Sequence, residues 1–506
     1  MNKLSFLLSI SLFIFYNSFA QDTSRVSKTD TVISIKRYTI SEFRKEVDKL
    51  LEDKNFQTAF FGIVIKSLNT GEIIYSQNEN KLFIPASNLK LFTTASALEN
   101  LGPKYQFKTK IYLQGEIRYS TVYGDLIIKG GGDPTFSGRF YNNNIFKVFD
   151  DWIDSLLDLG INNIRGNIIG DDNLFDESVY GKGWSKDYES YWYAAPVSAL
   201  SFNDNCVDLV IFYNKDLDSV FVRYTPEFRG INVINQLIPV SPLESATNID
   251  IIRESSTNKI RIVGTFSRTS DTLRTSASIY NPTYFTLNAL KNRMELRGIK
   301  ILGYTSSIDD YNKKIDYQNA SHLFNYYSPY LYNIVKVINK GSQNFYSEQV
   351  LKILGAEKKG LGSFENGISV IQEWLLNNGL NVEHILMYDG SGLSPLNRVT
   401  PLQIVNLLEL MYKSKNFPFY YNSLPIAGID GTLSRRMKNT LAEGRIRAKT
   451  GFISFARNLS GYAKTLDNED IAFSILINNF NVPLKLVENL QDKICNLIVS
   501  ITRKEL

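Results

Sequence analysis

A serine and a lysine three residues apart, Ser87 and Lys90, are the residues of this chain best placed for nucleophilic chemistry. They lie in a segment, 85–101, whose apolar residues predict a buried helix that begins near Pro85 and ends before Gly102. Residues at i and i+3 of a helix share one face, with Cβ atoms about 5–6 Å apart. A neutral lysine amine at that distance can take the serine proton, so the spacing predicts a serine nucleophile with a lysine base.

The spacing alone is a weak signal, because Ser256 and Lys259 repeat it in a polar turn with no helix behind it. The surroundings of Ser87 separate the two cases. The helix that follows Ser87 is apolar, and a lysine on a buried helix is uncommon unless it is paired or has a function. The first pair is therefore the candidate, and the second is the ordinary structural case.

Two further motifs follow in the chain. Ser342 and Asn344 stand two residues apart and offer a hydroxyl that can relay a proton and an amide that can hold a carbonyl or an amine. Lys449, Thr450 and Gly451 end a β-like run, in which alternation places the lysine and the glycine on one face. The lysine can bind a carboxylate, and the glycine lets a ligand approach the backbone. Each motif taken alone is also typical of an ordinary turn or strand end.

Ser-x-x-Lys, Ser-x-Asn and Lys-Thr-Gly occur here in the order that active-site-serine β-lactamases and penicillin-binding proteins share. With them, the chain resembles the class C low-molecular-mass penicillin-binding proteins, the D-alanyl-D-alanine carboxypeptidase/endopeptidase family. Four longer segments carry this resemblance, which extends over roughly residues 40–495: they are 83–90, 130–135, 389–394 and 427–433.

The resemblance implies a serine-type D-alanyl-D-alanine carboxypeptidase, with endopeptidase activity as a family trait. Its substrates would be peptidoglycan stem peptides, cleaved through an acyl-enzyme, and β-lactams would acylate it. Two alternatives stay open: a β-lactamase-like hydrolase that uses the same acylation, and a non-catalytic peptidoglycan-binding protein. The preference between carboxypeptidase and endopeptidase action, the diamino acid of the stem peptide and the oligomeric state are not determined by the sequence.

The resemblance also implies the roles of the motif residues. Ser87 would be the nucleophile and Lys90 the base, with a pKa lowered by burial and by the charge of Lys449. Ser342 would carry the proton to the leaving amine, and Asn344 would orient Lys90 and the substrate amide.

The third motif would bind substrate. Lys449 would hold the terminal carboxylate, with Thr450 and Gly451 beside it, and the backbone N–H groups of Ser87 and Phe452 would form the oxyanion hole. One residue departs from the family pattern: Gln343 stands in the middle of Ser-x-Asn, where the family usually has Asp. We expect this change to affect substrate preference rather than the reaction.

Composition narrows the class of protein further. The 506 residues are 43% hydrophobic and 21% charged, which gives enough apolar material for a large core and too long a chain for one ordinary domain. A net charge of +5 does not indicate a nucleic-acid partner. The two histidines, His322 and His384, exclude a metal site built from several histidines. We expect no metal and no cofactor.

Helices and strands at both ends of the chain flank a long stretch of short strands and turns, which predicts one α/β domain split by an insertion. The resemblance makes this a penicillin-binding-protein transpeptidase-like domain, an antiparallel sheet flanked by helices, with a β-rich insertion. The expected ranges are 1–20 for a signal peptide, 21–37 for a linker, 38–112 for the first part of the catalytic domain, 113–277 for the insertion and 278–506 for the second part.

The N-terminus predicts export. One charge at Lys3, an apolar run over 4–15 and small residues that end at Ala20 are typical of a secretory signal peptide. The alternative is a membrane anchor that is retained, but the run is short for a membrane-spanning helix, which needs about 20 apolar residues. With the family resemblance we expect a periplasmic protein, or else a secreted or wall-associated one. Whether Cys206 and Cys495 pair there stays open.

Overall fold

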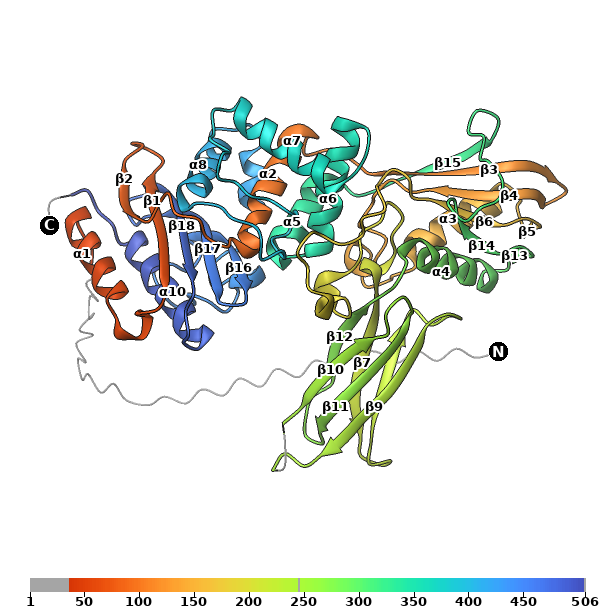
Figure 1. Cartoon of the computed structure of the whole chain (residues 1–506), viewed down its shortest axis with the longest axis horizontal. Helices are drawn as coiled ribbons and strands as arrows, with labels where there is room; N and C mark the ends of the chain where they lie inside the picture. Colours follow the sequence, from red (N-terminus) through yellow and green to blue (C-terminus); the bar gives the residue numbers. More distant parts are fainter. Residues whose placement is uncertain (1–35, 244–245, 505–506) are drawn as a thin grey trace, which may run out of the picture. The chain divides into compact units, whose positions relative to one another are not determined.

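The catalytic part of the chain is built on a five-stranded antiparallel sheet (Figure 1). The computed structural model describes residues 36–243 and 246–504. The strand order is β16-β17-β18-β1-β2, so that strands from both ends of the chain meet in one sheet. Their bounds are β1 (Phe60–Ser67), β2 (Ile73–Gln77), β16 (Ile446–Ile453), β17 (Ala456–Lys464) and β18 (Asp470–Asn478).

Helices cover both faces of this sheet, because its strands alternate apolar side chains between two cores. In β1, Ile63 and Ile65 pack with α1 (Ile40–Leu51) and α10 (Leu484–Val499), whereas Val64 faces the opposite core. That second core holds five further helices around the buried α2. Helix α2 spans Lys90–Asn100, and the five around it are α5 (Leu331–Gly341), α6 (Asn344–Lys359), α7 (Phe364–Asn377), α8 (Pro401–Tyr412) and α9 (Phe417–Ser423). The predicted α/β fold with helices on both faces is confirmed.

A second sheet forms the base of the inserted block. It has the order β13-β5-β4-β3-β15, with β6 and β14 paired beside β4, and α3 and α4 share its apolar core. The bounds are β3 (Lys108–Arg118), β4 (Thr121–Lys129), α3 (Lys147–Asp158), β5 (Asn163–Ile164), β6 (Ile168–Asp171), α4 (Pro282–Leu296), β13 (Lys300–Ile301), β14 (Thr305–Ser307) and β15 (Ser321–Tyr327).

This sheet extends beyond the range 113–277 that we expected for the insertion. It begins with β3, and its last strand, β15, pairs antiparallel with β3 although the two are separated by about two hundred residues. Strands β13 and β14 likewise pair with β5 and β6. Pairing at such separation leaves no local pattern in the sequence, and for this reason the sequence predicts residues 282–327 as part of the second catalytic segment. The division of the chain into domains stays a prediction.

Two three-stranded sheets complete the inserted block, in the orders β12-β7-β8 and β10-β11-β9. They lie within the range that the alternation of short strands and turns predicted to be rich in β-structure. Their bounds are β7 (Cys206–Asn214), β8 (Ser219–Thr225), β9 (Asn232–Val240), β10 (Asn248–Arg253), β11 (Lys259–Ser267) and β12 (Leu273–Ser278).

The expected signal peptide, 1–20, and the expected linker up to residue 35 lie outside the described residues. Within the described ranges, none of the helices combines the length and the apolar character that a membrane crossing requires. Cys206 and Cys495 are both buried, and each is a free thiol.

Candidate active site

Ser87 stands on a tight turn rather than on the helix that we expected. Residues Ala86–Leu89 form a 3₁₀ turn, η2, and α2 begins only at Lys90. In a 3₁₀ turn the side chains at i and i+3 are eclipsed, so the Ser-x-x-Lys spacing still brings the two residues together. Ala86 has a φ of +46°, a conformation that non-glycine residues adopt at a cost and that often occurs at functional sites.

Lys90 contacts the serine hydroxyl directly. Its Nζ lies 3.0 Å from Ser87 Oγ, 2.6 Å from Asn344 Oδ1 and 2.7 Å from the Ser391 carbonyl oxygen. The lysine is fully buried, whereas Ser87 remains half-buried at the protein surface. The ammonium or amine therefore has three neutral oxygen partners, of which the serine is the one that a substrate can reach.

Burial lowers the pKa of Lys90, because a charged amine loses its hydration there. The second cause that we expected, repulsion between the Lys90 and Lys449 amines, lowers the pKa of Lys449. The charges that shift the pKa of Lys90 are the carboxylates of Glu348 and Asp389, and both raise it. The balance still favours a lowered pKa, since desolvation is the largest of these effects.

Glu348 is a site residue that the sequence interpretation missed. It lies one turn after Asn344 on α6, fully buried, and its carboxylate accepts hydrogen bonds from the backbone N–H groups of Gly390, at 2.7 Å, and Ser391, at 2.8 Å. It thereby fixes the turn whose Ser391 carbonyl accepts from Lys90. A carboxylate four residues after Asn344, and so on the same face of the helix as that motif residue, was the signal that could have indicated it.

The turn at 389–394, one of the segments that carried the family resemblance, is held by Asp389. This buried carboxylate accepts from the N–H groups of Gly392, at 2.8 Å, and Ser394, at 2.6 Å, and from the indole of Trp184, at 2.9 Å. A Cβ on Gly392 would lie 1.9 Å from the Ala86 carbonyl oxygen. The turn therefore packs against the backbone immediately before Ser87 and needs glycine at this position.

Lys449 and Ser342 form a second contact in the site. Lys449 Nζ donates to Ser342 Oγ at 2.8 Å and to the Thr450 carbonyl at 2.8 Å, and Lys449 is fully buried. Burial, followed by the charge of Lys90, lowers the pKa of Lys449. Ser342 caps the C-terminal end of α5 with a φ of +56°, and Thr450 Oγ1 donates to Thr432 Oγ1 at 2.9 Å.

Strand β16 presents its edge to the Ser87 turn. It is the last strand of the sheet, and a Cβ on Gly451 would lie 2.7 Å from the Pro85 carbonyl oxygen. Ala448 N–H donates to Pro425 on the side of β16 that faces away from β17. Because alternate residues of a strand direct their N–H groups to one side, the N–H of Phe452 points to that same edge. This is the geometry that the predicted oxyanion hole requires, and the assignment stays a prediction.

The inserted block contributes to the site through a backbone contact. Asn344 Nδ2 donates to the Tyr193 carbonyl at 2.7 Å, which fixes the amide so that its oxygen faces Lys90. Gln343, between the two motif residues, instead lines a separate cavity of about 230 Å³ with Arg139 and Asp204.

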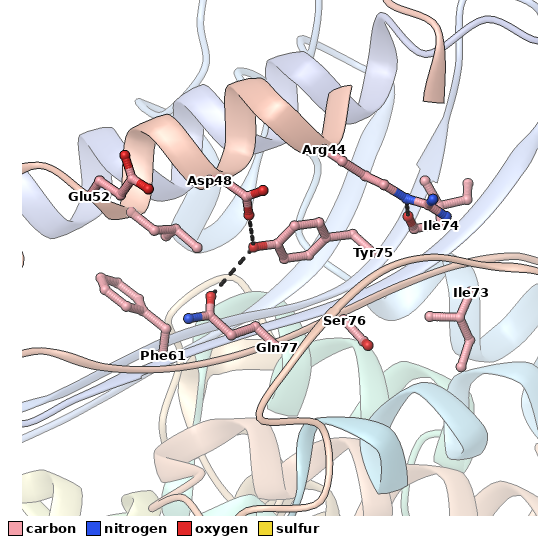
Figure 2. A pocket seen from close by; sticks show the side chains of 10 residues that line it. Arg44, Asp48, Glu52, Phe61, Ile73, Ile74, Tyr75, Ser76 and Gln77 are labelled. Atoms are coloured by element: carbon pink, nitrogen blue, oxygen red, sulfur yellow. Dashed lines mark hydrogen bonds between the residues drawn. The ribbon is translucent and has the colours of Figure 1, made fainter. Parts of the chain in front are cut away.

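The two histidines of the chain make their contacts outside the group of residues around Ser87. His322 hydrogen-bonds Asn325 at 2.9 Å, and His384 lines a small cavity beside α8. A larger cavity of about 620 Å³ lies between α1 and β2, at the sheet edge opposite to β16 (Figure 2). There Tyr75 donates to Asp48 at 2.7 Å and Arg44 donates to the Ile74 carbonyl at 2.7 Å.

A serine served by a buried lysine, on an α/β domain of this topology, defines an active-site-serine hydrolase. The chain belongs to the D-Ala-D-Ala carboxypeptidase 3 (S13) family, whose model matches residues 43–498. It is 29% identical over 458 residues to a D-alanyl-D-alanine carboxypeptidase of Actinomadura sp. strain R39, covering 88% of this chain and 83% of the relative. It is 24% identical over 435 residues to D-alanyl-D-alanine carboxypeptidase DacB of Haemophilus influenzae, covering 83% of this chain and 85% of that relative.

The fold agrees with a solved structure. The crystal structure of penicillin-binding protein 4 (DacB) from Haemophilus influenzae superposes with a TM-score of 0.78 at 23% sequence identity, over 90% of this chain and 99% of that one. The family model and the relatives confirm the predicted family and its class of enzyme, D-alanyl-D-alanine carboxypeptidase, and the solved structure confirms the transpeptidase-like fold. The roles of the individual site residues stay predictions.

Proposed function

We propose that Ser87 is the nucleophile and Lys90 the general base in a carboxypeptidase that removes the C-terminal D-alanine of peptidoglycan stem peptides. The observation that carries this proposal is the 3.0 Å contact between a fully buried lysine amine and the serine hydroxyl. Burial lowers the pKa of Lys90 and so increases the fraction of neutral amine, the form that can accept a proton.

The reaction proceeds in two stages. Ser87 Oγ attacks the carbonyl carbon of the penultimate D-alanine, a C–O bond forms, and the hydroxyl proton moves to Lys90. The oxyanion accepts from the N–H groups of Ser87 and Phe452, each worth about 3 kcal/mol in comparable sites. The C–N bond then breaks, the leaving amine takes a proton through Ser342, and water hydrolyses the acyl ester to restore Ser87.

Recognition of the terminal carboxylate falls to Lys449, with Thr450 and Gly451 on the same strand. A lysine ammonium is a compact charge suited to a carboxylate, and Ser342 already lies 2.8 Å from it. A bound carboxylate raises the pKa of Lys449 and offsets the burial that lowers it in the free protein. Asn344 orients Lys90 and the substrate amide.

We extend the proposal to cleavage of cross-linked peptides and to acylation by β-lactams. Both use the same attack by Ser87, and the penicillin-binding protein 4 of Haemophilus influenzae has also been solved in complex with a β-lactam. The pattern at the N-terminus supports action in the periplasm, where this polymer is found; a secreted or wall-associated location is the alternative.

The test uses the two Ser-x-x-Lys pairs of the chain as matched variants. The wild-type protein and a Ser256→Ala variant are expected to take up labelled penicillin covalently and to release D-alanine from a pentapeptide. A Ser87→Ala variant with an unchanged melting temperature is expected to do neither. Mass spectrometry of the intact protein and an assay of free D-alanine give both results. A covalent adduct on the Ser87→Ala variant would overturn the nucleophile assignment.

A further inference from the structure

A cavity of about 570 Å³, far from Ser87, collects lysines and tyrosines on the outer face of the inserted sheet. We call it the lysine–tyrosine cavity and define it by Lys108 and Lys110 of β3, Lys129 of β4, and Tyr105, Tyr317 and Tyr327. Its volume falls in the range of about 300–1,000 Å³ that is usual for small-molecule sites. Glu357, near the C-terminal end of α6, also lines the cavity and lies about 20 Å along the helix from Asn344.

Lys110 is placed where its charge does not stabilise the fold. Lys110 and Lys129 are direct cross-strand partners, so two like charges stand on one face of an antiparallel pair. Such pairs are destabilising, because the Cβ atoms are only about 5 Å apart. Within the described ranges, the Lys110 ammonium has no ion-pair, hydrogen-bond or ring partner.

The other groups of the cavity are already occupied. Lys129 Nζ lies 3.5 Å from Asp171 and 4.0 Å from the ring centre of Tyr317, whose hydroxyl also donates to Asp171. Glu357 accepts from the Tyr105 hydroxyl at 2.9 Å. Asp171 is thus paired with Lys129 and Tyr317, Glu357 is paired with Tyr105, and the excess positive charge is centred on Lys110.

The open end of the cavity adds an aromatic surface. Lys108 Nζ lies 5.6 Å from the ring centre of Tyr327, and half of the Tyr327 surface remains exposed. A Cβ on Gly131 would lie 2.1 Å from the Lys108 carbonyl oxygen, so glycine allows the chain after β4 to pass close to β3. That close passage keeps Lys108 and Lys129 at one end of the sheet, together with Lys110.

We propose that the lysine–tyrosine cavity is a second binding site that takes a carboxylate group of a peptidoglycan stem peptide while another stem peptide occupies the Ser87 site. Lysine is suited to this role as a point charge for carboxylate or phosphate oxygens. The inference rests on the proposed function for the identity of the polymer. A second contact on the same polymer raises the effective concentration of cleavable peptide at Ser87 without changing the chemistry there.

The test compares Lys110→Gln with Lys300→Gln. Lys300 is an exposed lysine of β13, at the far edge of the same sheet, and serves as the matched control. Each protein is first acylated with penicillin, so that the Ser87 site is closed, and is then titrated calorimetrically with a soluble disaccharide-tetrapeptide and, separately, with inorganic phosphate. The acylated wild type and Lys300→Gln are expected to bind the disaccharide-tetrapeptide equally, and Lys110→Gln about tenfold more weakly.

Stability and kinetics give two further results. Because Lys110 and Lys129 carry like charges that repel each other, the Lys110→Gln variant should have an unchanged or raised melting temperature. A structural role for Lys110 would lower it. For the unblocked proteins, Lys110→Gln is expected to raise KM for insoluble peptidoglycan and to leave the kinetics on a free pentapeptide unchanged. Equal binding by both variants, or binding of phosphate without binding of the disaccharide-tetrapeptide, would overturn the proposal. Since binding is measured on blocked protein, it does not depend on which residues carry out catalysis.

Discussion

Lys90 and Lys352 are both fully buried, and the protein holds them in opposite ways. The hydrogen-bond partners of Lys90 are a hydroxyl, an amide oxygen and a backbone carbonyl, none of them charged. Lys352, two turns after Asn344 on α6, donates to the Asp176 carboxylate at 2.6 Å and lies 4.7 Å from the ring centre of Phe364. Burial lowers the pKa of both lysines, but only Lys352 has a carboxylate in contact that opposes the change.

The difference separates a lysine that is kept available for proton transfer from one that is kept charged. A buried carboxylate in contact with an amine is left unpaired when the amine loses its proton, which is costly. Neutral oxygen partners carry no such cost, so Lys90 can exchange its proton with Ser87. The carboxylates nearest to this lysine, Glu348 and Asp389, are held instead by backbone N–H groups.

The largest effect is expected from removal of Lys90, the lysine without a charged partner. A Lys90→Gln variant loses the general base, and kcat/KM for D-alanine release is expected to fall about 10³-fold, within the usual range for general-base catalysis. The matched control is Lys259→Gln in the second Ser-x-x-Lys pair, which should retain wild-type kinetics. Activity of Lys90→Gln within tenfold of wild type would contradict the assignment of Lys90 as the base.

Loss of the carboxylate partner of Lys352 is expected to reduce stability rather than activity. An Asp176→Asn variant leaves the Lys352 charge buried without its partner, and we expect a loss of about 3 kcal/mol in the free energy of unfolding. Below its melting temperature the variant should keep the pH profile of wild type, because Lys352 does not contact Ser87. Urea denaturation measures the loss, and Asp187→Asn, an exposed carboxylate of the same inserted block, is the control. An unchanged unfolding curve would indicate that Lys352 is not charged.

An Asn344→Asp variant would give Lys90 a carboxylate partner, as Lys352 has in the wild-type protein. It places a carboxylate where an amide oxygen now lies 2.6 Å from Lys90 Nζ, and an opposite charge at that distance raises a lysine pKa. The base is neutral only above its pKa, so the acid limb of the kcat/KM profile should move to higher pH. Activity at neutral pH should fall about tenfold, equivalent to one pH unit, and recover in part as the pH rises. A uniform loss at every pH would indicate a steric effect instead.

The smallest effect is expected at Glu348. Its carboxylate raises the pKa of Lys90, so a Glu348→Gln variant should lower that pKa and move the acid limb of kcat/KM to lower pH, by less than about one unit. The amide keeps one acceptor for the two N–H groups that Glu348 now binds, and the turn at 389–392 should persist. A shift to higher pH would contradict the sign of the interaction.

Local patterns in the sequence predicted the elements with strong periodicity and clear caps. The buried helix predicted over 85–101 is present as η2 and α2, which end at Asn100, and the β-like run that holds Lys449, Thr450 and Gly451 is strand β16. The Ser87–Lys90 contact was also predicted, although a 3₁₀ turn rather than an α-helix produces it. These features depend on interactions within a few residues, which a sequence displays directly.

Contacts between distant segments were accessible only through the family resemblance or not at all. Asn344 reaches Lys90 across 254 residues, and Ser342 reaches Lys449 across 107. Periodicity cannot indicate such pairs; the shared order of three motifs did. Glu348 and the β3–β15 pairing belong to no motif that we considered, and their partners are fixed by tertiary packing, so the sequence interpretation missed both.

Helix α6 sets a limit on how the gene for this chain can vary in length. Asn344, Glu348 and Lys352 are spaced by four residues, so they follow one another along one side of the helix, where all three are buried. An insertion or deletion of one residue between them would rotate everything downstream by about 100° and turn a carboxylate or an ammonium into the apolar core. A single substitution leaves this register intact, but the number of residues from Asn344 to Lys352 is expected to be invariant.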